Sequence, residues 1–369
     1  MNKKVLFILH LPPPVHGSSM VGQYIRDSLN INQEFDARYI NLGTSKTIDE
    51  IGKNPLKKVG SYLKIIGNTF HHLLFFKPDL VYLAITAKGI GFYKDVVIAF
   101  LVKLFGVPLV LHFHNKGVSE NQDRFIDDLL YKVVFKNTKV ILLSKYLYYD
   151  IKKYVNEAAV SYCPNGIPEI EPQINTKIDS NNTVQLLFLS NLIEAKGVII
   201  VLEACKQLQI KQLSFHCTFV GGEGDISDQQ FNQKVASLGL EEEVHYAGRK
   251  YGTEKNTEFS KAAVFILPTY YHNECFPLVL LEAMQFALPI VSTFEGGIPD
   301  IVEDGGTGFL VPQKNARALA DKLEILINNA ELRGQMGVFG REKYEKKFTI
   351  AVFETKLTSI LKTVLNTKA

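Results

Sequence analysis

The sequence predicts an α/β protein with two Rossmann-like domains, each built on a parallel sheet. Short apolar runs alternate with helical patterns along the chain, which is typical of βαβ units. This pattern starts twice, before and after a polar stretch at residues 168–182 that holds two prolines and no periodicity, which indicates an interdomain linker. The chain has 369 residues, 46% of them hydrophobic, and can fill two cores. We expect the two sheets to face each other across a cleft, with ligands at the carboxyl ends of their strands.

The N-terminal domain is predicted over residues 1–168. Its expected strands are Val5–Leu11, Leu80–Ile85, Val107–His114, Val140–Ser144 and Ser161–Pro164. Helical patterns lie near residues 18–30, 55–76, 92–105, 123–135 and 145–155. The apolar run near the N-terminus is too short for the hydrophobic region of a signal peptide, so we interpret it as a first buried strand.

The C-terminal domain is predicted over residues 183–348. Its expected strands are Leu186–Ser190, Cys217–Val220, Val244–Ala247, Val264–Pro268 and Ile290–Thr293. From about Asn315 the pattern is helical to the end of the chain. Because the four cysteines have no short paired spacing, neither a zinc site nor a disulfide scaffold is expected, and a reducing cytoplasmic location is predicted.

The net charge of +3 hides an asymmetry between the two halves of the chain. Residues 1–150 hold 19 Lys and Arg against 12 Asp and Glu, whereas the remainder is acidic. A basic half favours an anionic partner such as a membrane surface or a lipid phosphate, and no dense Lys/Arg cluster with aromatics points to nucleic acid. The basic, amphipathic helix expected over 55–76 could meet the inner membrane surface through Lys57, Lys58 and Lys64; alternatively it packs its apolar side within its own domain.

Two glutamates eight positions apart mark the most informative segment of the chain. A helix is expected from about Pro277 to Ala287, because proline suits the first helical turn. Glu274 then lies in the loop before the helix, and Glu282 lies within it among apolar side chains. A buried carboxylate needs a partner, and the helix N-terminus beside it can bind an anion. A ligand and an ion pair with a Lys or Arg elsewhere both satisfy this requirement.

Strand ends supply the other candidate residues. Gly17 follows the first strand, where a bare backbone admits a phosphate or sugar and Ser18 or Ser19 could cap the next helix. Period-two alternation places His112 and His114 on one face, with His114 at the carboxyl end. Gly222 and Gly248 follow apolar strands, where they allow either close approach of a nucleotide or a simple tight turn.

Several motifs in this order resemble the retaining enzymes of glycosyltransferase family 4, also called glycosyl transferases group 1, which have the GT-B fold. The resemblance rests on the two glutamates followed by Ala283-Met284, and on Asn165-Gly-Ile167, Lys196-Gly197, Val220-Gly-Gly222, Pro289-Ile-Val291, Gly296–Val302 and Gly305–Pro312. It extends from about residue 140 to 312 and is weaker before that. The resemblance implies that the last helix, about 349–369, crosses back to the N-terminal domain.

The resemblance also implies roles for individual residues. Glu282 would accept hydrogen bonds from the nucleotide's ribose hydroxyls, and Glu274 would contact the donor sugar and face the reacting carbon. Backbone N–H groups of Phe276, Leu278 and Val279 would point at the sugar and phosphate, Lys196 would lie near the diphosphate, and Gly222 and Gly248 would flank the base and diphosphate. Gly17 would contact the donor, and His114 would lie near its sugar.

One departure from the family pattern concerns phosphate charge. Many relatives carry an arginine where this chain has Asn191. Helix N-termini, or a second cation such as Arg249 or Lys250, would then have to help Lys196.

The expected function is therefore transfer of a hexosyl or N-acetylhexosaminyl group, with retention, from a nucleotide-diphosphate sugar. UDP is the expected nucleotide, and a glycan or lipid-linked glycan in bacterial cell-surface polysaccharide synthesis is the expected acceptor. No cofactor and no metal are expected, since no Asp-x-Asp motif follows a strand. The alternatives are a sugar-nucleotide epimerase of the same fold and a catalytically silent sugar-nucleotide-binding protein.

Overall fold

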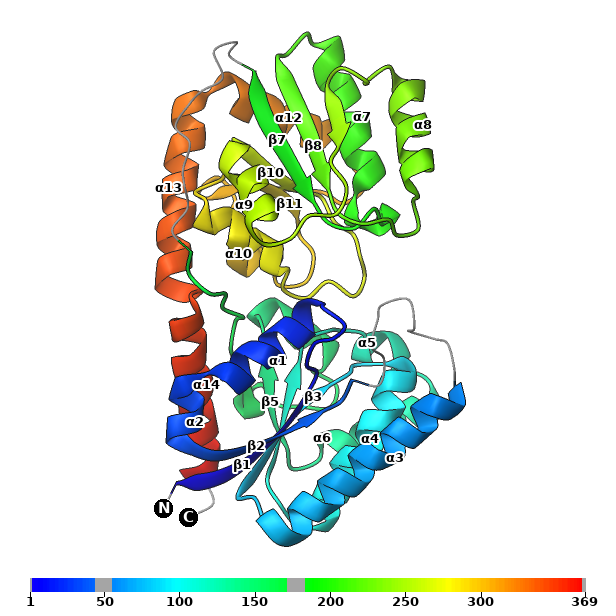
Figure 1. Cartoon of the computed structure of the whole chain (residues 1–369), viewed down its shortest axis with the longest axis vertical. Helices are drawn as coiled ribbons and strands as arrows, with labels where there is room; N and C mark the ends of the chain where they lie inside the picture. Colours follow the sequence, from blue (N-terminus) through cyan, green and yellow to red (C-terminus); the bar gives the residue numbers. More distant parts are fainter. Residues whose placement is uncertain (1, 44–54, 171–182, 367–369) are drawn as a thin grey trace. The chain divides into compact units, whose positions relative to one another are not determined.

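The computed structural model describes residues 2–43, 55–170 and 183–366. The chain forms two compact units, residues 1–166 with 350–369 and residues 167–349 (Figure 1). Most of the stretch interpreted as a linker lies outside the described residues.

The first unit is a six-stranded parallel sheet in the order β2-β1-β3-β4-β5-β6. The strands are β1 (Lys3–Leu9), β2 (Phe35–Asn41), β3 (Leu80–Ile85), β4 (Leu109–Phe113), β5 (Lys139–Leu142) and β6 (Val160–Tyr162). The central strands are buried on both faces, which is why they are continuous apolar runs in the sequence. Edge strand β2 was not predicted, because its Asp36 and Arg38 interrupt the apolar pattern.

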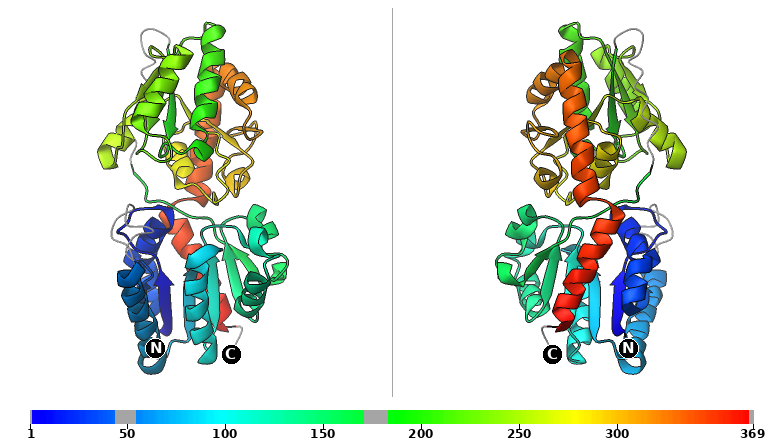
Figure 2. Two further views of the ribbon diagram at one scale, coloured as in Figure 1. Left: turned by 90° about the vertical axis from the view of Figure 1, so that its right-hand side faces the viewer. Right: turned by 90° about the vertical axis from the view of Figure 1, so that its left-hand side faces the viewer.

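Helices cover both faces of this sheet. They are α1 (Gly17–Asp27), α2 (Leu29–Glu34), α3 (Pro55–His71), the π-helical turn η2 (His72–Phe76), α4 (Gly89–Leu104), α5 (Val118–Asn121), α6 (Phe125–Phe135) and α14 (Ile350–Asn366). The last helix, α14, belongs to this unit and packs beside α2 (Figures 1 and 2). The helix predicted near 145–155 is a shorter 3-10 helix, η3 (Lys145–Asp150).

Helices α3, α4 and α6 lie side by side in that order on the first unit (Figure 1). The Tyr62 hydroxyl of α3 donates to the Lys94 carbonyl of α4 over 2.5 Å, and Phe92 of α4 packs on Tyr131 of α6 with ring centroids 4.5 Å apart. Helix α3 buries Ile65 and Thr69 but leaves Leu63 exposed, so only part of its apolar surface packs within the domain. The side chains of Lys57 and Lys58 lie outside the described residues. No helix in the described part of the chain is long and apolar enough to span a membrane.

The second unit has another six-stranded parallel sheet, in the order β12-β11-β10-β7-β8-β9. Its strands are β7 (Val184–Leu189), β8 (Phe215–Val220), β9 (Val244–Tyr246), β10 (Val264–Leu267), β11 (Ile290–Thr293) and β12 (Gly308–Val311). Its helices are α7 (Val198–Ile210), α8 (Asp228–Leu238), α9 (Gly252–Lys261), α10 (Leu278–Gln285), α11 (Ile298–Ile301), α12 (Ala316–Asn328) and α13 (Ala330–Lys347). Strand β12 was not predicted, since it is short and begins with glycine.

Candidate active site

The strand order of the second unit creates one point where a ligand site is expected. The chain runs outward from β7 through β8 to β9, and then returns to β10, which pairs with the other side of β7. In open parallel sheets such a switch point leaves a crevice at the carboxyl ends of the strands. Asn191 and Lys196 follow β7 here, and Tyr271 and Glu274 follow β10.

Lys196 and Glu274 meet at this switch point. The Lys196 Nζ forms an ion pair with the Glu274 Oε2, and the same Nζ lies 4.8 Å from the centre of the Tyr271 ring. The two side chains are only 17% and 10% exposed. At this burial each charge needs the other, because an unpaired buried charge is strongly destabilising. The sequence predicted both as site residues, but it did not predict that they contact each other.

The backbone around Glu274 packs closely against the loop that follows β11. A Cβ on Gly296, whose φ is +53°, would lie 2.3 Å from the Glu274 carbonyl oxygen. The Gly297 N–H donates to the Cys275 carbonyl over 2.6 Å. Glycine at 296 is therefore required both by its left-handed backbone and by this close approach. The loop therefore holds the backbone that carries the Glu274 side chain.

The N-termini of α7 and α10 lie at the same edge of the sheet. Pro277 was expected in the first turn of α10, but it is the N-cap, and the helix begins at Leu278. The helix ends at Gln285 rather than at Ala287, because Ala287 adopts a left-handed φ of +53°. Neither helix has a side-chain cap or an acid in its first turn. Phe276 is buried just ahead of α10, and Leu278 and Val279 form its half-buried first turn. The free N–H groups of both helices give this edge a partial positive charge.

Glu282 is half-buried on α10 and already has a cationic partner. Its Oε1 accepts a hydrogen bond from the Lys255 Nζ of α9 over 2.8 Å, and both side chains are about a quarter exposed. The ion pair that the sequence analysis gave as one alternative for Glu282 is therefore present, and its partner is Lys255, which was not among the candidate residues. Lys255 has no recognisable pattern around it, since it is one of several polar residues on α9.

Arg249 occupies the space beside Asn191. The Asn191 Oδ1 accepts a hydrogen bond from the Gly222 N–H over 3.1 Å, and a Cβ on Gly222 would lie 2.2 Å from a terminal nitrogen of Arg249. No carboxylate among the described residues pairs with Arg249, which is exposed. Lys250, the other cation considered, instead forms an ion pair with Glu258 over 2.7 Å.

Glycines make room for the Arg249 side chain and shape the loop that carries it. Gly222 leaves open the volume that the guanidinium fills. Gly248, with a φ of +68°, accepts a hydrogen bond from the Gly221 N–H over 2.9 Å through its carbonyl. This glycine-lined floor with one exposed guanidinium can accept an anion.

His114 lies just past β4 in the first unit, on the same side as His112. The two rings are 4.2 Å apart. His112 is a buried core histidine whose Nδ1 lies 2.6 Å from the Tyr82 hydroxyl oxygen, whereas the buried Nδ1 of His114 has no partner among the described residues. Burial, and then the neighbouring His10 and His16, lower the pKa of His114 to about 3. His114 is therefore neutral at physiological pH and suited to hydrogen bonding rather than to balancing negative charge.

Gly17 is the first residue of α1 and lies exposed. A Cβ there would meet nothing within 4 Å, so packing within the chain does not require glycine. The helix is capped by His16, not by Ser18 or Ser19: the His16 Nδ1 accepts from the Ser19 N–H, and the Ser19 hydroxyl oxygen accepts from the His16 N–H. Ser19 completes the capping box from the third helical position.

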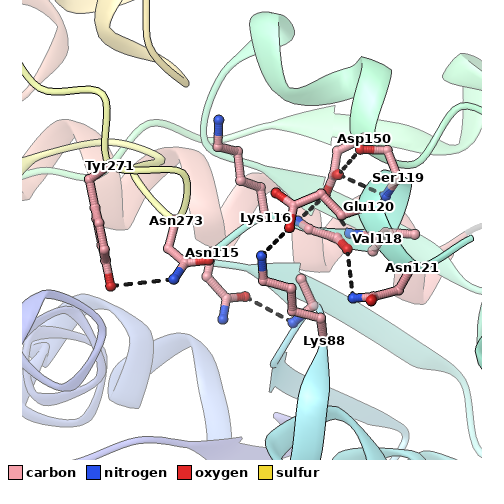
Figure 3. Close-up of polar contacts among 12 residues, drawn as sticks. Lys88, Asn115, Lys116, Val118, Ser119, Glu120, Asn121, Asp150, Tyr271 and Asn273 are labelled. Carbon is pink, nitrogen blue, oxygen red and sulfur yellow. Dashed lines mark hydrogen bonds and ion pairs between the residues drawn. The ribbon is translucent and has the colours of Figure 1, made fainter. Parts of the chain in front are cut away.

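Several polar residues that were not predicted as site residues lie together at the carboxyl end of the first sheet (Figure 3). The Asp150 carboxylate accepts the N–H groups of Gly117, Val118 and Ser119 over 2.9, 3.1 and 2.9 Å. Lys88 pairs with Glu120, and the Asn115 Oδ1 accepts from the Ala87 N–H over 2.9 Å. Lys88 and Asn115 each follow a strand end, which is the signal that could have found them.

In the second unit, Asn273 donates a hydrogen bond to the Tyr271 hydroxyl over 3.3 Å (Figure 3). This contact lies in the loop between β10 and α10 that also carries Glu274. Across the described residues, no group of three or more His, Cys, Asp and Glu could hold a metal ion.

Solved structures of similar architecture identify the fold as GT-B. Anabaena HepE in complex with UDP matches with a TM-score of 0.77, 17% identity, and coverage of 98% of this chain and 100% of HepE. Sucrose-phosphate synthase of Thermosynechococcus elongatus matches with a TM-score of 0.75, 16% identity, and coverage of 99% and 100%. The predicted fold class is confirmed.

Sequence comparison points to the same family that the motifs predicted. The family model of glycosyl transferases group 1 matches residues 170–343. The putative colanic acid biosynthesis glycosyltransferase WcaL of Escherichia coli (strain K12) is 32% identical over 185 residues, which are 48% of this chain and 45% of WcaL. The amylovoran biosynthesis glycosyltransferase AmsK of Erwinia amylovora is 31% identical over 199 residues, or 52% and 48%. The chain thus spans about half the length of these curated relatives.

Proposed function

We propose that the protein is a retaining glycosyltransferase that moves a hexosyl or N-acetylhexosaminyl group from a UDP-sugar to a glycan or lipid-linked glycan. One observation carries this proposal: the buried Lys196–Glu274 pair lies at the switch point of the second sheet, at the same edge as two uncapped helix N-termini. Such an edge can hold a negatively charged leaving group. The names of WcaL and AmsK, a colanic acid and an amylovoran biosynthesis glycosyltransferase, support a role in polysaccharide synthesis.

The diphosphate of the donor would be bound by the positive charges of this edge. Lys196 supplies a point charge, Arg249 a planar fork that suits phosphate oxygens, and α7 and α10 their N-terminal N–H groups, including those of Leu278 and Val279. In the reaction the bond between the anomeric carbon and the phosphate oxygen breaks. The acceptor hydroxyl attacks from the same face, and its proton passes to the leaving phosphate. The positive edge stabilises the charge that develops on that phosphate.

The ion pairs Lys196–Glu274 and Lys255–Glu282 would be exchanged for contacts with the bound donor. Glu282 would exchange Lys255 for the two ribose hydroxyls, since two carboxylate oxygens match a vicinal diol. Lys196 would turn from Glu274 to the diphosphate, which frees Glu274 to accept hydroxyls of the donor sugar. In the first unit, neutral His114 and the bare backbone of Gly17 would contact the donor from their own sheet edge. Gly222 and Gly248 would lie against the nucleotide.

The donor assignment draws support from a structural neighbour, because HepE was solved with UDP and with UDP-glucose. The test is a panel of sugar nucleotides incubated with the protein, with and without acceptor extracts, while nucleotide release is measured. Release that depends on an acceptor supports transfer. A donor epimerised without release would establish the epimerase alternative, and tight binding without any turnover would establish a silent binding protein.

Glu282→Gln is expected to weaken UDP binding about tenfold to a hundredfold. The substitution keeps the shape of the side chain but removes a charge-assisted hydrogen bond, which contributes roughly 1.5–3 kcal/mol. Calorimetry on the folded variant measures this loss, with the exposed Glu342→Gln on α13 as the control. Unchanged affinity would remove Glu282 from the donor site.

Arg249→Ala is expected to weaken UDP binding about tenfold, with a loss that shrinks as salt rises. The removed guanidinium is the exposed cation beside Asn191 and Gly222. Lys346→Ala, which removes an exposed charge from α13, is the control. For the same reason Asn191→Arg should not tighten binding, because the new arginine meets Arg249. Tightening by Asn191→Arg, with no effect of Arg249→Ala, would contradict this assignment.

Transfer is expected to persist in EDTA. The charge on the leaving group is assigned to Lys196, Arg249 and helix N-termini, and no Asp-x-Asp motif follows a strand in the sequence. Initial rates with EDTA, with Mg²⁺ and with Mn²⁺ check this directly. Loss of activity in EDTA that either metal restores would refute the metal-independent mechanism.

A further inference from the structure

The outer side of α4 in the first unit is apolar along its whole length. Its exposed residues Ile90, Tyr93, Val97, Phe100 and Leu104 follow one another at intervals of three and four, so they form a single stripe. The stripe that normally faces water on such a helix carries charges. The buried side of α4 is also apolar, and it packs on β3 and β4.

Helix α6 extends this apolar surface. Phe125, Ile126, Leu129 and Val133 are exposed on it, by between 37% and 84%. Phe135, on the buried side of α6, stacks on Phe113 of β4, so α4 and α6 cover the same side of the sheet and their outer surfaces face the same way. We call the exposed residues of α4 and α6 named here the apolar face. A contiguous exposed apolar surface of this kind marks an interaction site.

The charges around the apolar face are mostly positive, and the exposed acids near it, Glu120 and Asp123, lie ahead of α6. Lys132 and Lys136 lie on and just after α6, Lys94 and Lys103 lie on α4, and Lys64 lies on the neighbouring α3. No acid on α3, α4 or α6 is exposed: α3 has none, Asp95 and Asp127 are buried, and Asp128 is half-buried and paired with Lys132 and Lys153. The partner that fits this surface is both apolar and anionic.

A groove opens at the end of the apolar face. It has a volume of about 720 Å³, and Phe100 and Val133 of the apolar face line it together with Lys103, Lys136 and Lys139. Burial, and then the charge of Lys136, lower the pKa of Lys103. A phosphate group in this groove would relieve the repulsion between these lysines while apolar groups packed on Phe100 and Val133.

We propose that the apolar face docks on an anionic lipid bilayer, with lipid phosphates in the lysine-lined groove. Aromatic and aliphatic side chains would enter the region between headgroups and acyl chains, and the flanking lysines would contact the headgroups. A second copy of the chain fits poorly, because a symmetric contact would bring like charges together with no exposed acid on these helices to pair them. The docking is independent of the reaction proposed for the second unit.

The test is co-sedimentation of the full chain with vesicles of phosphatidylcholine alone and vesicles that also contain phosphatidylglycerol. We expect binding to the anionic vesicles that weakens with salt. Phe125→Glu and Leu104→Glu, at positions 84% and 72% exposed, should each reduce binding about tenfold without loss of folding. Lys103→Gln and Lys136→Gln should each reduce it about fivefold. The control is Ile210→Glu, an equally drastic change at a 70% exposed position of the second unit, which should bind like the wild type.

Three results would overturn the proposal. The first is no binding of the wild type to anionic vesicles at low salt, or binding that Phe125→Glu leaves unchanged. The second is a dimer in solution that Leu104→Glu dissociates while vesicles are not bound, which would assign the face to a second copy. The third is stabilisation of the wild type by inorganic phosphate, lost in Lys103→Gln, without vesicle binding, which would assign the groove to a free anion. UDP affinity, measured on the same variants, should not change, so failure of docking is separable from failure of the proposed function.

Discussion

Glu274→Gln is expected to lower turnover by about 10²- to 10³-fold, which is the size of effect seen when one group that stabilises a transition state is removed. Affinity for UDP itself should be unchanged or tighter. The carboxylate is buried beside Lys196, in a loop that Gly296 and Gly297 hold in place. Loss of its charge removes the proposed contact with the sugar and leaves Lys196 free for the phosphates. Steady-state kinetics and calorimetry with UDP and a UDP-sugar measure the two effects separately.

The matched control for this variant is Glu258→Gln. Glu258 is another buried glutamate of the second unit, paired with Lys250 and Lys261 away from the switch point. Its substitution should lower the melting temperature without a comparable loss of turnover. If Glu274→Gln lost UDP and UDP-sugar affinity equally, with turnover of the bound donor intact, Glu274 would be a structural residue.

Lys196→Ala is expected to lower kcat/KM by about 10²- to 10³-fold and also to weaken UDP binding. The substitution removes the most buried cation at the switch point and leaves Glu274 as a buried charge without its partner. Lys196→Arg, which keeps the charge, should retain more activity than Lys196→Ala but less than the wild type, since a guanidinium does not match an ammonium at a close contact.

The double variant Lys196→Ala/Glu274→Gln tests whether the two residues act together. Because they touch, their effects on stability should not add: removing both charges should destabilise the protein less than the sum of the single substitutions. Chemical denaturation measures these free energies of unfolding. Strict additivity would mean that the ion pair does not form in solution.

The fold could be predicted from the sequence because parallel strands buried on both faces leave continuous apolar runs, as in Val5–Leu9. The two strands that were missed each lie at one edge of a sheet: β2 carries Asp36 and Arg38, and β12 is short and begins with Gly308. The helix that carries Glu282 was placed to within two residues, since Pro277 marks its start.

The site could be predicted in part. Sequence motifs predicted site roles for Glu274, Glu282 and Lys196. The ion pairs that these residues form could not be predicted, because they depend on the order of the strands in the sheet, which no local pattern contains. Arg249 could not be told from Lys250, because only the fold turns one toward Gly222 and the other toward Glu258. The apolar face was hidden for a different reason: in sequence, an exposed apolar stripe such as that of α4 is indistinguishable from a buried one.

The central claim is transfer of a sugar with retention, and the anomeric configuration of the first product tests it most directly. A UDP-sugar found active in the panel would be incubated with the protein and an acceptor, and the anomeric configuration of the new linkage would be determined by NMR. An α-linked donor should give an α-linked product with one UDP released per bond formed. A β-linked product from the same donor, or sugar release to water with no glycosidic bond formed, would contradict the account.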